Sequence, residues 1–321
     1  MSDDTWAVDR IRPRARVVID NDYCGDPDGV AQLAHHLLCH SIEIPFVVGS
    51  AVAPHHPQWT PDCGQTSAAV AQRVADLAGR DDVRVLPGSS VPMTSPTEPI
   101  RNEAVDALIA EALRDDTDLP LFVACGGGLT MLASALVIEP RIADRITLVW
   151  NGGERYSMTA DQLASDARYR ETNLNTDMVA SRLVFNESTM MIWQMPQDVF
   201  SAALASRAEL LTRVRPYGPL GEHVYTAIGA RVDAWSRGLK MGETYGLGDH
   251  PLVLLTALGG PYDSNPYTSR WIDRPRPYLT EDGLYEDRPD GAPIRVFTWI
   301  DVRLMFEDFY AKLQLLAADP R

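Results

Sequence analysis

Hydrophobic and polar residues follow two rhythms along the first half of the chain. Short apolar runs predict buried strands over residues 16–20, 42–48, 83–86, 121–124 and 146–150. Apolar residues three and four positions apart predict helices over residues 28–40, 67–78, 103–113 and 129–138. Strands that alternate with helices in this way are typical of a mostly parallel sheet with helices on both faces. We therefore predict an α/β fold.

The second half of the chain has a less regular pattern. Helices are expected over residues 178–185, 222–237, 251–258 and 302–317, and strands over residues 190–194 and 295–300. Residues 265–290 are rich in Pro, Asp, Tyr and Arg, which predicts a long surface excursion. No stretch reads as a linker, so we expect residues 1–321 to form one domain.

Net charge and cysteine spacing exclude several classes of function. The formal net charge of −15 makes nucleic acid a poor partner, because an acidic surface repels phosphate backbones. The four cysteines include no C-x-x-C pair, which argues against a zinc or redox motif. No secretory signal is visible at the N-terminus, and no apolar run reaches the roughly 20 residues of a membrane span. We expect a soluble cytoplasmic protein without a membrane partner.

The segment between the first predicted strand and helix is dense in carboxylates. It reads DNDYCGDPDG and contains Asp20, Asp22, Asp26 and Asp28. Ligands of open parallel sheets bind beyond the carboxyl ends of the strands, where this segment lies. Clustered carboxylates repel one another unless a cation neutralises them. Oxygen ligands without nitrogen or sulfur favour calcium or magnesium over zinc, and a cage this dense favours calcium.

Other structures and functions share parts of this pattern. Asp26-Pro27-Asp28 is also a good helix start, although that interpretation leaves Asp20 and Asp22 unexplained. An Asp-x-Asp after a strand occurs in phosphatases of the haloacid dehalogenase type, but here Tyr23-Cys24 follows where Gly-Thr is usual. The three glycines of residues 126–128 lack the Gly-Lys-Ser/Thr of a phosphate loop. We expect them to let backbone carbonyls approach a metal.

The aspartate segment resembles the signature D-x-D-x-G-x-D-D of the inosine–uridine-preferring nucleoside hydrolases, with an insertion. Further stretches resemble motifs of that family in the same order: residues 46–50 (FVVGS), 125–140 (CGGGLTMLASALVIEP), 146–153 (ITLVWNGG), 171–173 (ETN) and 248–252 (GDHPL). The resemblance spans residues 16–258 and implies the Rossmann-like fold of that family.

The resemblance also implies roles for individual residues. A calcium ion would be held by Asp22, Asp28, Asp249 and a backbone carbonyl near Gly126. Asp22 would in addition take a proton from the attacking water. The remaining side chains would bind sugar hydroxyls: Asp26, Ser50, Asn151, Glu171 and Asn173.

The sequence departs from the family at three places. Purine-active members have a histidine just before the distant aspartate, which helps to protonate the departing base. Here that position is Gly248, and His250 follows the aspartate, either as a turn residue or in a role at the site. The asparagine that the family carries shortly before its Glu-x-Asn motif is missing from residues 157–170. Met131 stands where the family has another asparagine, so sugar recognition is partly altered.

Two further groups of residues keep alternative interpretations. Residues 54–59 (PHHPQW) follow the second strand and form either a plain surface loop, which we prefer, or a lid over the ligand. His223, Tyr225 and Trp235 lie on one predicted helix and either pack there or stack on a base.

The sequence supports two hypotheses of function. The first is calcium-dependent hydrolysis of the N-glycosidic bond of a ribonucleoside or related ribosyl compound, with water activated by Asp22. The second is a catalytically altered or inactive homologue that binds a ribosyl ligand through the same metal site. Retention of the carboxylates favours the first, and Gly248 favours the second. We expect a small-molecule nucleoside or ribosyl partner and a homo-oligomer, either a dimer or a tetramer.

Overall fold

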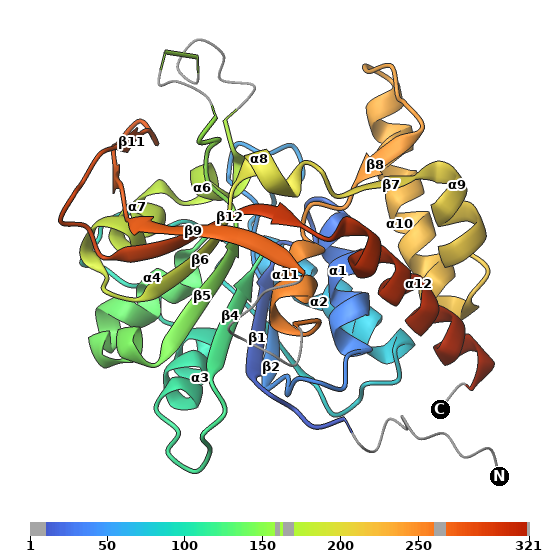
Figure 1. The fold of residues 1–321 in the computed structure, drawn as a ribbon, viewed down its shortest axis with the longest axis horizontal. Helices are drawn as coiled ribbons and strands as arrows, with labels where there is room; N and C mark the ends of the chain where they lie inside the picture. The colour runs from blue at the N-terminus through green and yellow to red at the C-terminus, as the bar shows by residue number, and fades with distance from the viewer. Residues whose placement is uncertain (1–10, 158–160, 163–169, 260–267, 320–321) are drawn as a thin grey trace.

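The fold is built around one large sheet, shown in the computed structural model of Figure 1. The structure describes residues 11–157, 161–162, 170–259 and 268–319. The N-terminal ten residues, on which the expectation about a secretory signal rests, lie outside the described residues, as do residues 265–267 of the expected excursion.

The sheet has eight strands in the order β3-β2-β1-β4-β5-β6-β12-β9. Neighbouring strands are parallel except for β9, which runs antiparallel to β12 at one edge. The strands are β1 (Arg16–Asn21), β2 (Phe46–Gly49), β3 (Arg84–Pro87), β4 (Leu121–Cys125), β5 (Ile146–Asn151), β6 (Met191–Met195), β9 (Ser269–Pro275) and β12 (Pro293–Ile300). This order confirms the predicted α/β fold.

Helices cover both faces of the sheet (Figure 1). One layer contains α1 (Asp28–Leu37), α2 (Cys63–Leu77), α10 (Gly218–Ser236), α11 (Pro251–Thr256) and α12 (Val302–Ala318). The other layer contains α3 (Glu103–Ala112), α4 (Thr130–Ile138) and α7 (Met178–Arg182). Each layer packs on its own face of the sheet as a separate apolar cluster. The β–α alternation read from the sequence therefore corresponds to a three-layer structure.

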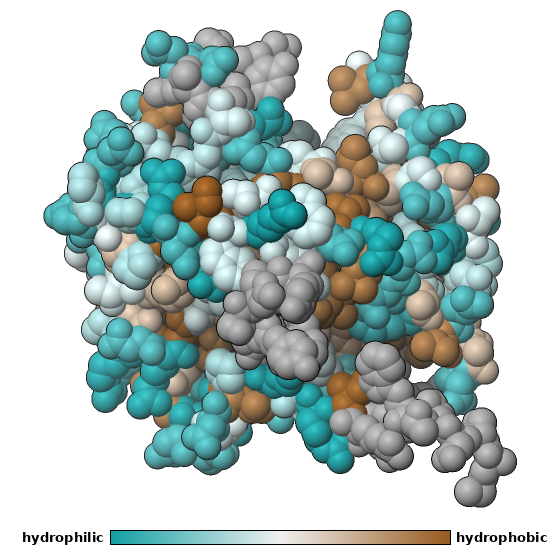
Figure 2. Space-filling model, in the orientation of Figure 1, coloured by the Kyte–Doolittle hydropathy of each residue, from teal (hydrophilic) through white to brown (hydrophobic). Residues whose placement is uncertain are grey.

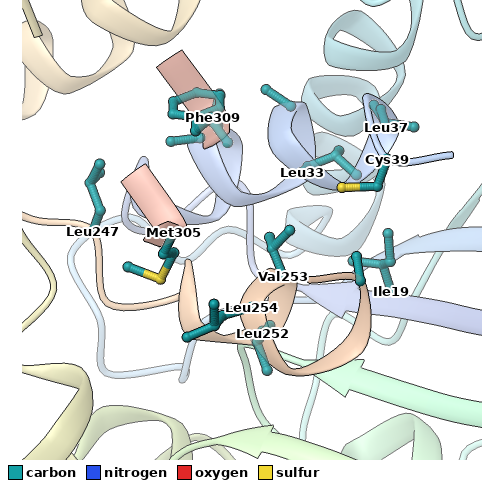
Figure 3. Packing of buried hydrophobic residues seen from close by; sticks show 14 of the residues in the cluster. Ile19, Leu33, Leu37, Cys39, Leu247, Leu252, Val253, Leu254, Met305 and Phe309 are labelled. Carbon is teal, nitrogen blue, oxygen red and sulfur yellow. The ribbon is translucent and has the colours of Figure 1, made fainter. Parts of the chain in front are cut away.

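The core under α1 explains why the chain just after β1 is held firmly. Figure 3 shows Ile19 of β1, Leu33 of α1, Val253 of α11 and Phe309 of α12 gathered in one apolar cluster, each fully shielded from solvent. Burying one such side chain contributes about 1.5–3 kcal/mol. The segment that joins β1 to α1 is thus anchored on both sides by buried elements.

The structure corrects the expectation for residues 265–290. The described part of this segment does lie mostly at the surface, but it contains the edge strand β9 and the strands β10 (Tyr278–Leu279) and β11 (Tyr285–Glu286), which were not predicted. The sequence pattern did not indicate β9, because an edge strand needs only one buried face and most residues of β9 are exposed or half-exposed.

Several short elements near the ends of the large strands have no period that a sequence reading detects. They are α6 (Thr172–Thr176), α8 (Gln197–Phe200), β7 (Leu204–Ser206), α9 (Arg207–Glu209) and β8 (Thr244–Gly246). The second strand also begins later than predicted, at Phe46. The predicted helix over residues 178–185 is α7 followed by a π-helical segment, Leu183–Glu187.

The surface in Figure 2 is hydrophilic over most of its outline, with hydrophobic residues confined to smaller patches. Within the described ranges, no helix combines the length and the apolar character that crossing a bilayer requires.

Candidate metal and sugar site

The predicted site residues come from the ends of adjacent strands. The strand order reverses between β1 and β4, and ligands of such sheets bind at that switch point. Asp20 is the next-to-last residue of β1 and is paired with Cys125, the residue before Gly126. Ser50 follows β2 and donates its hydroxyl hydrogen bond to the Asp20 carboxylate. Asn151 ends β5. Topology alone therefore brings four predicted segments to one edge.

Asp249 is held by two carboxamides from this edge. Asn21 Nδ2 donates to Asp249 Oδ2 at 2.9 Å, and Asn151 Nδ2 donates to Asp249 Oδ1 at 2.8 Å. Burial raises the pKa of Asp249 to about 7, although both hydrogen bonds oppose the rise. The hydrogen bond from Asn21 to Asp249 joins residues 228 positions apart in the sequence. The sequence pattern does not single out Asn21, which is a polar residue between two aspartates at a strand end.

Asp22 and Asp28 lie close enough to Asp249 for their charges to interact. The pKa of each carboxyl group is raised well above its usual value, first by burial and then by the Asp249 carboxylate. Asp28 Oδ1 accepts a hydrogen bond from the N–H of Gly29 at 2.9 Å. Ionising several neighbouring buried carboxyl groups costs free energy, and a cation at the centre of the cluster offsets that cost.

A glycine allows this close approach. A Cβ atom on Gly126 would lie 2.4 Å from Asn21 Nδ2 and 2.9 Å from Asp249 Cγ, so no other residue fits without displacing both side chains. The neighbouring Asn151 Oδ1 is buried and has no hydrogen-bond partner within the described structure. A buried acceptor without a partner, oxygen-only donors and a cradle that a Cβ would fill all suit a hard cation such as calcium.

The carboxylate oxygens of Asp22, Asp28 and Asp249 lie farther apart than the ligand atoms of a closed coordination shell. Among the described residues, possible ligand atoms from three side chains come within 4.8 Å of one another only at His35, Cys39 and Asp308. There Lys312 Nζ lies 2.5 Å from Asp308 Oδ2 and 3.1 Å from Cys39 Sγ. An ammonium group already neutralises that cluster, whereas the side-chain hydrogen bonds that the Asp249 carboxylate accepts come from the neutral carboxamides of Asn21 and Asn151.

The predicted sugar-binding residues Glu171 and Asn173 lie at the N-terminus of α6. Glu171 is the N-cap of α6, and its carboxylate accepts hydrogen bonds from the N–H groups of Gly153, Asn173 and Leu174 at 2.7–2.9 Å. A carboxylate has about four acceptor sites, so capacity for one more donor remains. Burial raises the pKa of Glu171 to about 7.

Asn173 ties two strand ends together. Its Nδ2 atom donates to the carbonyl of Gly126 at 2.9 Å and to the carbonyl of Asn151 at 2.8 Å. Both hydrogens of the amide are thereby used, which leaves Oδ1 to accept a hydrogen bond. The carbonyl of Gly126 retains its second lone pair.

Asp26 contacts residues that the sequence pattern did not indicate as part of the site. Tyr245 of β8 donates its hydroxyl to Asp26 Oδ1 at 2.6 Å. Trp235 of α10 stacks on Tyr245 with ring centroids 5.8 Å apart. Burial raises the pKa of Asp26, against the Tyr245 hydrogen bond and the Arg231 guanidinium. Of the aromatic residues on the predicted helix, Trp235 thus approaches the site, through Tyr245.

The helix-start interpretation of the aspartate segment is only partly correct. Helix α1 begins at Asp28, and its N-cap residue is Pro27, without a side-chain capping bond. Asp26 Oδ1 lies 3.4 Å from the Asp28 amide nitrogen, a long hydrogen bond. Asp26 is therefore directed mainly toward Tyr245.

His250 does not reach the site. Its ring packs against Phe309 at 4.9 Å and His35 at 5.5 Å, in the core beneath α12. Both ring nitrogens are buried without a partner in the described structure, and burial lowers the pKa of the imidazole well below its usual value. A Cβ on Gly248 would lie 3.3 Å from Asp28 Oδ2, so the side chain missing there would have faced the carboxylates.

The chain is thus an α/β protein with a Rossmann-like sheet, and buried carboxyl and carboxamide groups gather at the switch point of that sheet. Comparison with known families makes the class specific. The family model described as inosine-uridine preferring nucleoside hydrolase matches residues 28–252, and the chain belongs to this family. It is thus an N-ribosyl hydrolase by family, as the sequence motifs predicted.

Solved structures agree in fold at low sequence identity. A plant nucleoside hydrolase, PpNRh1, is 15% identical, with a TM-score of 0.71 over 94% of this chain and 99% of its own. The purine-preferring ribonucleoside hydrolase from Gardnerella vaginalis is 18% identical, with the same TM-score and coverage. The effector XopQ, solved with adenosine diphosphate ribose, is 17% identical, with a TM-score of 0.64 over 95% of this chain and 94% of its own. No curated protein sequence matches this chain.

Proposed function

We propose that this protein hydrolyses the N-glycosidic bond of a ribonucleoside or related ribosyl compound, with calcium as its cofactor and Asp22 as the base. The observation that carries the proposal is the shielded trio Asp22, Asp28 and Asp249 beside two carboxamides. Family membership supplies the reaction class.

The chain's own residues divide the work. Asp22, Asp28, Asp249 and the carbonyl of Gly126 would hold calcium. Bound there, the ion supplies charge that orients vicinal hydroxyls and makes water more acidic. Asp22, which directly follows β1, accepts the proton of the attacking water. Asn21 and Asn151 fix Asp249, and this second layer of contacts keeps the ligand oxygens oriented.

Sugar recognition falls to residues with unused hydrogen-bonding capacity. Asn173 Oδ1 and the free acceptor site of Glu171 suit ribose hydroxyls. Asn151 Oδ1, buried and without a partner in the described structure, suits a further hydroxyl donor. Asp26, held by Tyr245, takes another, and Ser50 acts through Asp20. Negative charge around the ring stabilises the positive charge that develops on the sugar.

A release assay tests the proposal. Free ribose is measured from a panel of purine and pyrimidine nucleosides, with calcium and with a chelator. We expect release that stops in the chelator and in Asp249→Asn, while Asp115→Asn, an exposed aspartate elsewhere, keeps full activity. Turnover that persists in chelator would contradict the calcium assignment, and no release from any nucleoside would contradict hydrolysis.

A second candidate is binding of a ribosyl ligand without turnover. Gly248 supplies no side chain, and His250 lies in the core, so the usual acid for the leaving group is missing there. The relative XopQ was solved with adenosine diphosphate ribose. Thermal stabilisation by ribose or adenosine diphosphate ribose, together with no release across the panel, would favour this candidate.

A further inference from the structure

The loop after β2 packs against the aspartate segment. A Cβ on Gly25 would lie 2.6 Å from Val52 Cγ1, so the two segments are in close contact. Residues 54–59 are exposed or half-buried, as expected of a surface loop. A small apolar cluster joins the loop to its neighbours: Ala51, Val52 and Cys63, with Cys24 and Trp59 packed against them. The aspartate segment, the loop and the start of α2 therefore meet in one place.

Two cysteines come together in this cluster. Cys24 Sγ and Cys63 Sγ lie 2.7 Å apart, although 39 positions separate the residues in the sequence. Both are free thiols. A disulfide bond is about 2.05 Å long, so a relative shift of about 0.7 Å brings the two sulfur atoms to bonding distance. The lack of a C-x-x-C pair thus does not exclude a redox pair, because the fold supplies the proximity that the sequence spacing does not.

The two thiols differ in their access to solvent. Cys24 is half-buried, whereas Cys63 is completely buried at the first residue of α2. An oxidant therefore reaches Cys24 first, and Cys63 is in position to attack the oxidised sulfur. Cys39 and Cys125 are both buried, and the contacts of their sulfur atoms are with oxygen and nitrogen atoms. The arrangement at Cys24 and Cys63 thus differs from that of the other two cysteines.

We propose that Cys24 and Cys63 form a reversible disulfide, which makes this pair a site of oxidative modification beside the aspartates. Glutathione keeps such a pair reduced in a reducing compartment, and a peroxide oxidises it. Because Cys24 lies between Asp22 and Asp26, the bond ties the aspartate segment to α2. The proposal does not depend on the hydrolase function.

Hydrogen peroxide is the oxidant in the simplest form of the reaction. The Cys24 thiolate attacks one peroxide oxygen, the O–O bond breaks, and hydroxide leaves, which gives a sulfenic acid. The Cys63 sulfur then attacks this sulfur, the S–S bond forms, and the sulfenic oxygen leaves as water. In total the two thiols lose two protons and two electrons, and one peroxide is reduced to two waters.

The environment of Cys24 affects the rate of this reaction. Burial and the hydrogen bond between the two thiols raise the pKa of Cys24 above its usual value. The thiolate is therefore scarce at neutral pH, although a thiolate of higher pKa is also intrinsically more nucleophilic. The raised pKa slows the oxidation without preventing it, so we expect the cross-link to form over hours rather than seconds.

Mass spectrometry of the full-length protein tests the proposal. The folded protein is incubated with hydrogen peroxide, its remaining thiols are alkylated, and the masses of the protein and its peptides are measured. We expect the loss of two hydrogens and one cross-linked pair of peptides, joined through Cys24 and Cys63, with full reversal by dithiothreitol. Since the bond closes a loop of about 40 residues, Tm should rise by about 5–10 °C on oxidation.

Single substitutions assign the bond to this pair. Cys24→Ser and Cys63→Ser should each prevent the cross-link and the rise in Tm. Cys39→Ser is the matched control and should form the cross-link as the wild type does. The Tm of each variant before oxidation shows whether it folds, which separates a misfolded variant from one that only lacks the bond.

Three results would overturn the proposal. If all four thiols of the wild-type protein stayed open to alkylation after peroxide, the two sulfur atoms would not react with each other. Sulfinic acid on Cys24 beside an intact Cys63 thiol would show that Cys63 does not attack the oxidised sulfur. A cross-link that persisted in Cys24→Ser would belong to another pair of cysteines.

Discussion

The chain leaving β4 passes so close to the site that a methyl group at residue 126 has no room. In Gly126→Ala the new Cβ would stand 2.4 Å from Asn21 Nδ2, where ordinary contact begins at 3.4 Å. Relieving the clash moves the Asn21 amide by about 1 Å, which stretches its 2.9 Å bond to Asp249 beyond hydrogen-bond range.

The cost follows from two effects. Overpacking a buried site costs about 1–3 kcal/mol, and a hydrogen bond to a charged group contributes about 1.5–3 kcal/mol. Since both arise from one displacement, we expect a loss of about 2–4 kcal/mol in unfolding free energy. The misplaced Asp249 should also weaken calcium binding about 10- to 100-fold. Denaturant unfolding and calorimetric calcium titration measure the two quantities.

Gly229→Ala is the matched control. Gly229 lies inside α10, and a Cβ there meets no atom within 4 Å. Alanine in a helix interior should stabilise by about 0.5–1 kcal/mol, with calcium affinity unchanged. If Gly126→Ala kept wild-type stability and calcium affinity, the close approach of Gly126, Asn21 and Asp249 would not organise the site.

Three further predictions concern single side chains. Asp22→Asn should abolish nucleoside turnover while ribose-dependent thermal stabilisation partly survives, because the amide keeps the shape but accepts no proton. With chelator present, ionisation of Glu171 should lower the free energy of unfolding as pH rises from about 4.5 to about 7, because burial raises its pKa in the folded state and the folded protein therefore holds a proton that the unfolded chain has lost. The expected slope is about 1.4 kcal/mol per pH unit. Glu171→Gln should remove this slope from the denaturation profile. Tyr245→Phe should raise KM for nucleosides more than it lowers kcat, because Asp26 loses the hydroxyl that orients it.

Each of these has a contrary outcome. A large loss of folding stability in Asp22→Asn would indicate a structural aspartate. An unchanged pH profile in Glu171→Gln, equal to that of the exposed control Glu98→Gln, would mean that Glu171 is ionised throughout the folded state. An unaltered KM in Tyr245→Phe would indicate that Asp26 does not take part in sugar recognition.

The large elements of the fold were predictable because their apolar periods are long. The run at residues 16–20 became β1, and the spacing at residues 28–40 became α1, shortened to end at Leu37. Edge strand β9 escaped because one of its faces is open to solvent, so its residues do not read as a buried run.

Site residues that are close together in the sequence could be predicted, whereas those that only the fold brings together could not. The aspartates of residues 20–28 stand together, and Asp249 was found through a family motif. Arg231 lies in helix α10 and Tyr245 in the short strand β8, and the sequence pattern of neither element indicates their common neighbour Asp26. Only tertiary structure brings such residues together. The expected dimer or tetramer stays a prediction.

The most direct test of the account is anomalous diffraction from crystals grown with calcium. We predict one peak among Asp22, Asp28 and Asp249, with six to eight oxygen ligands at about 2.3–2.6 Å, including the carbonyl of Gly126. Ordinary electron density for an ion with octahedral ligands at about 2.0–2.1 Å, without an anomalous peak, would indicate magnesium instead. No peak among these carboxylates, in crystals of protein that releases ribose, would contradict the central claim.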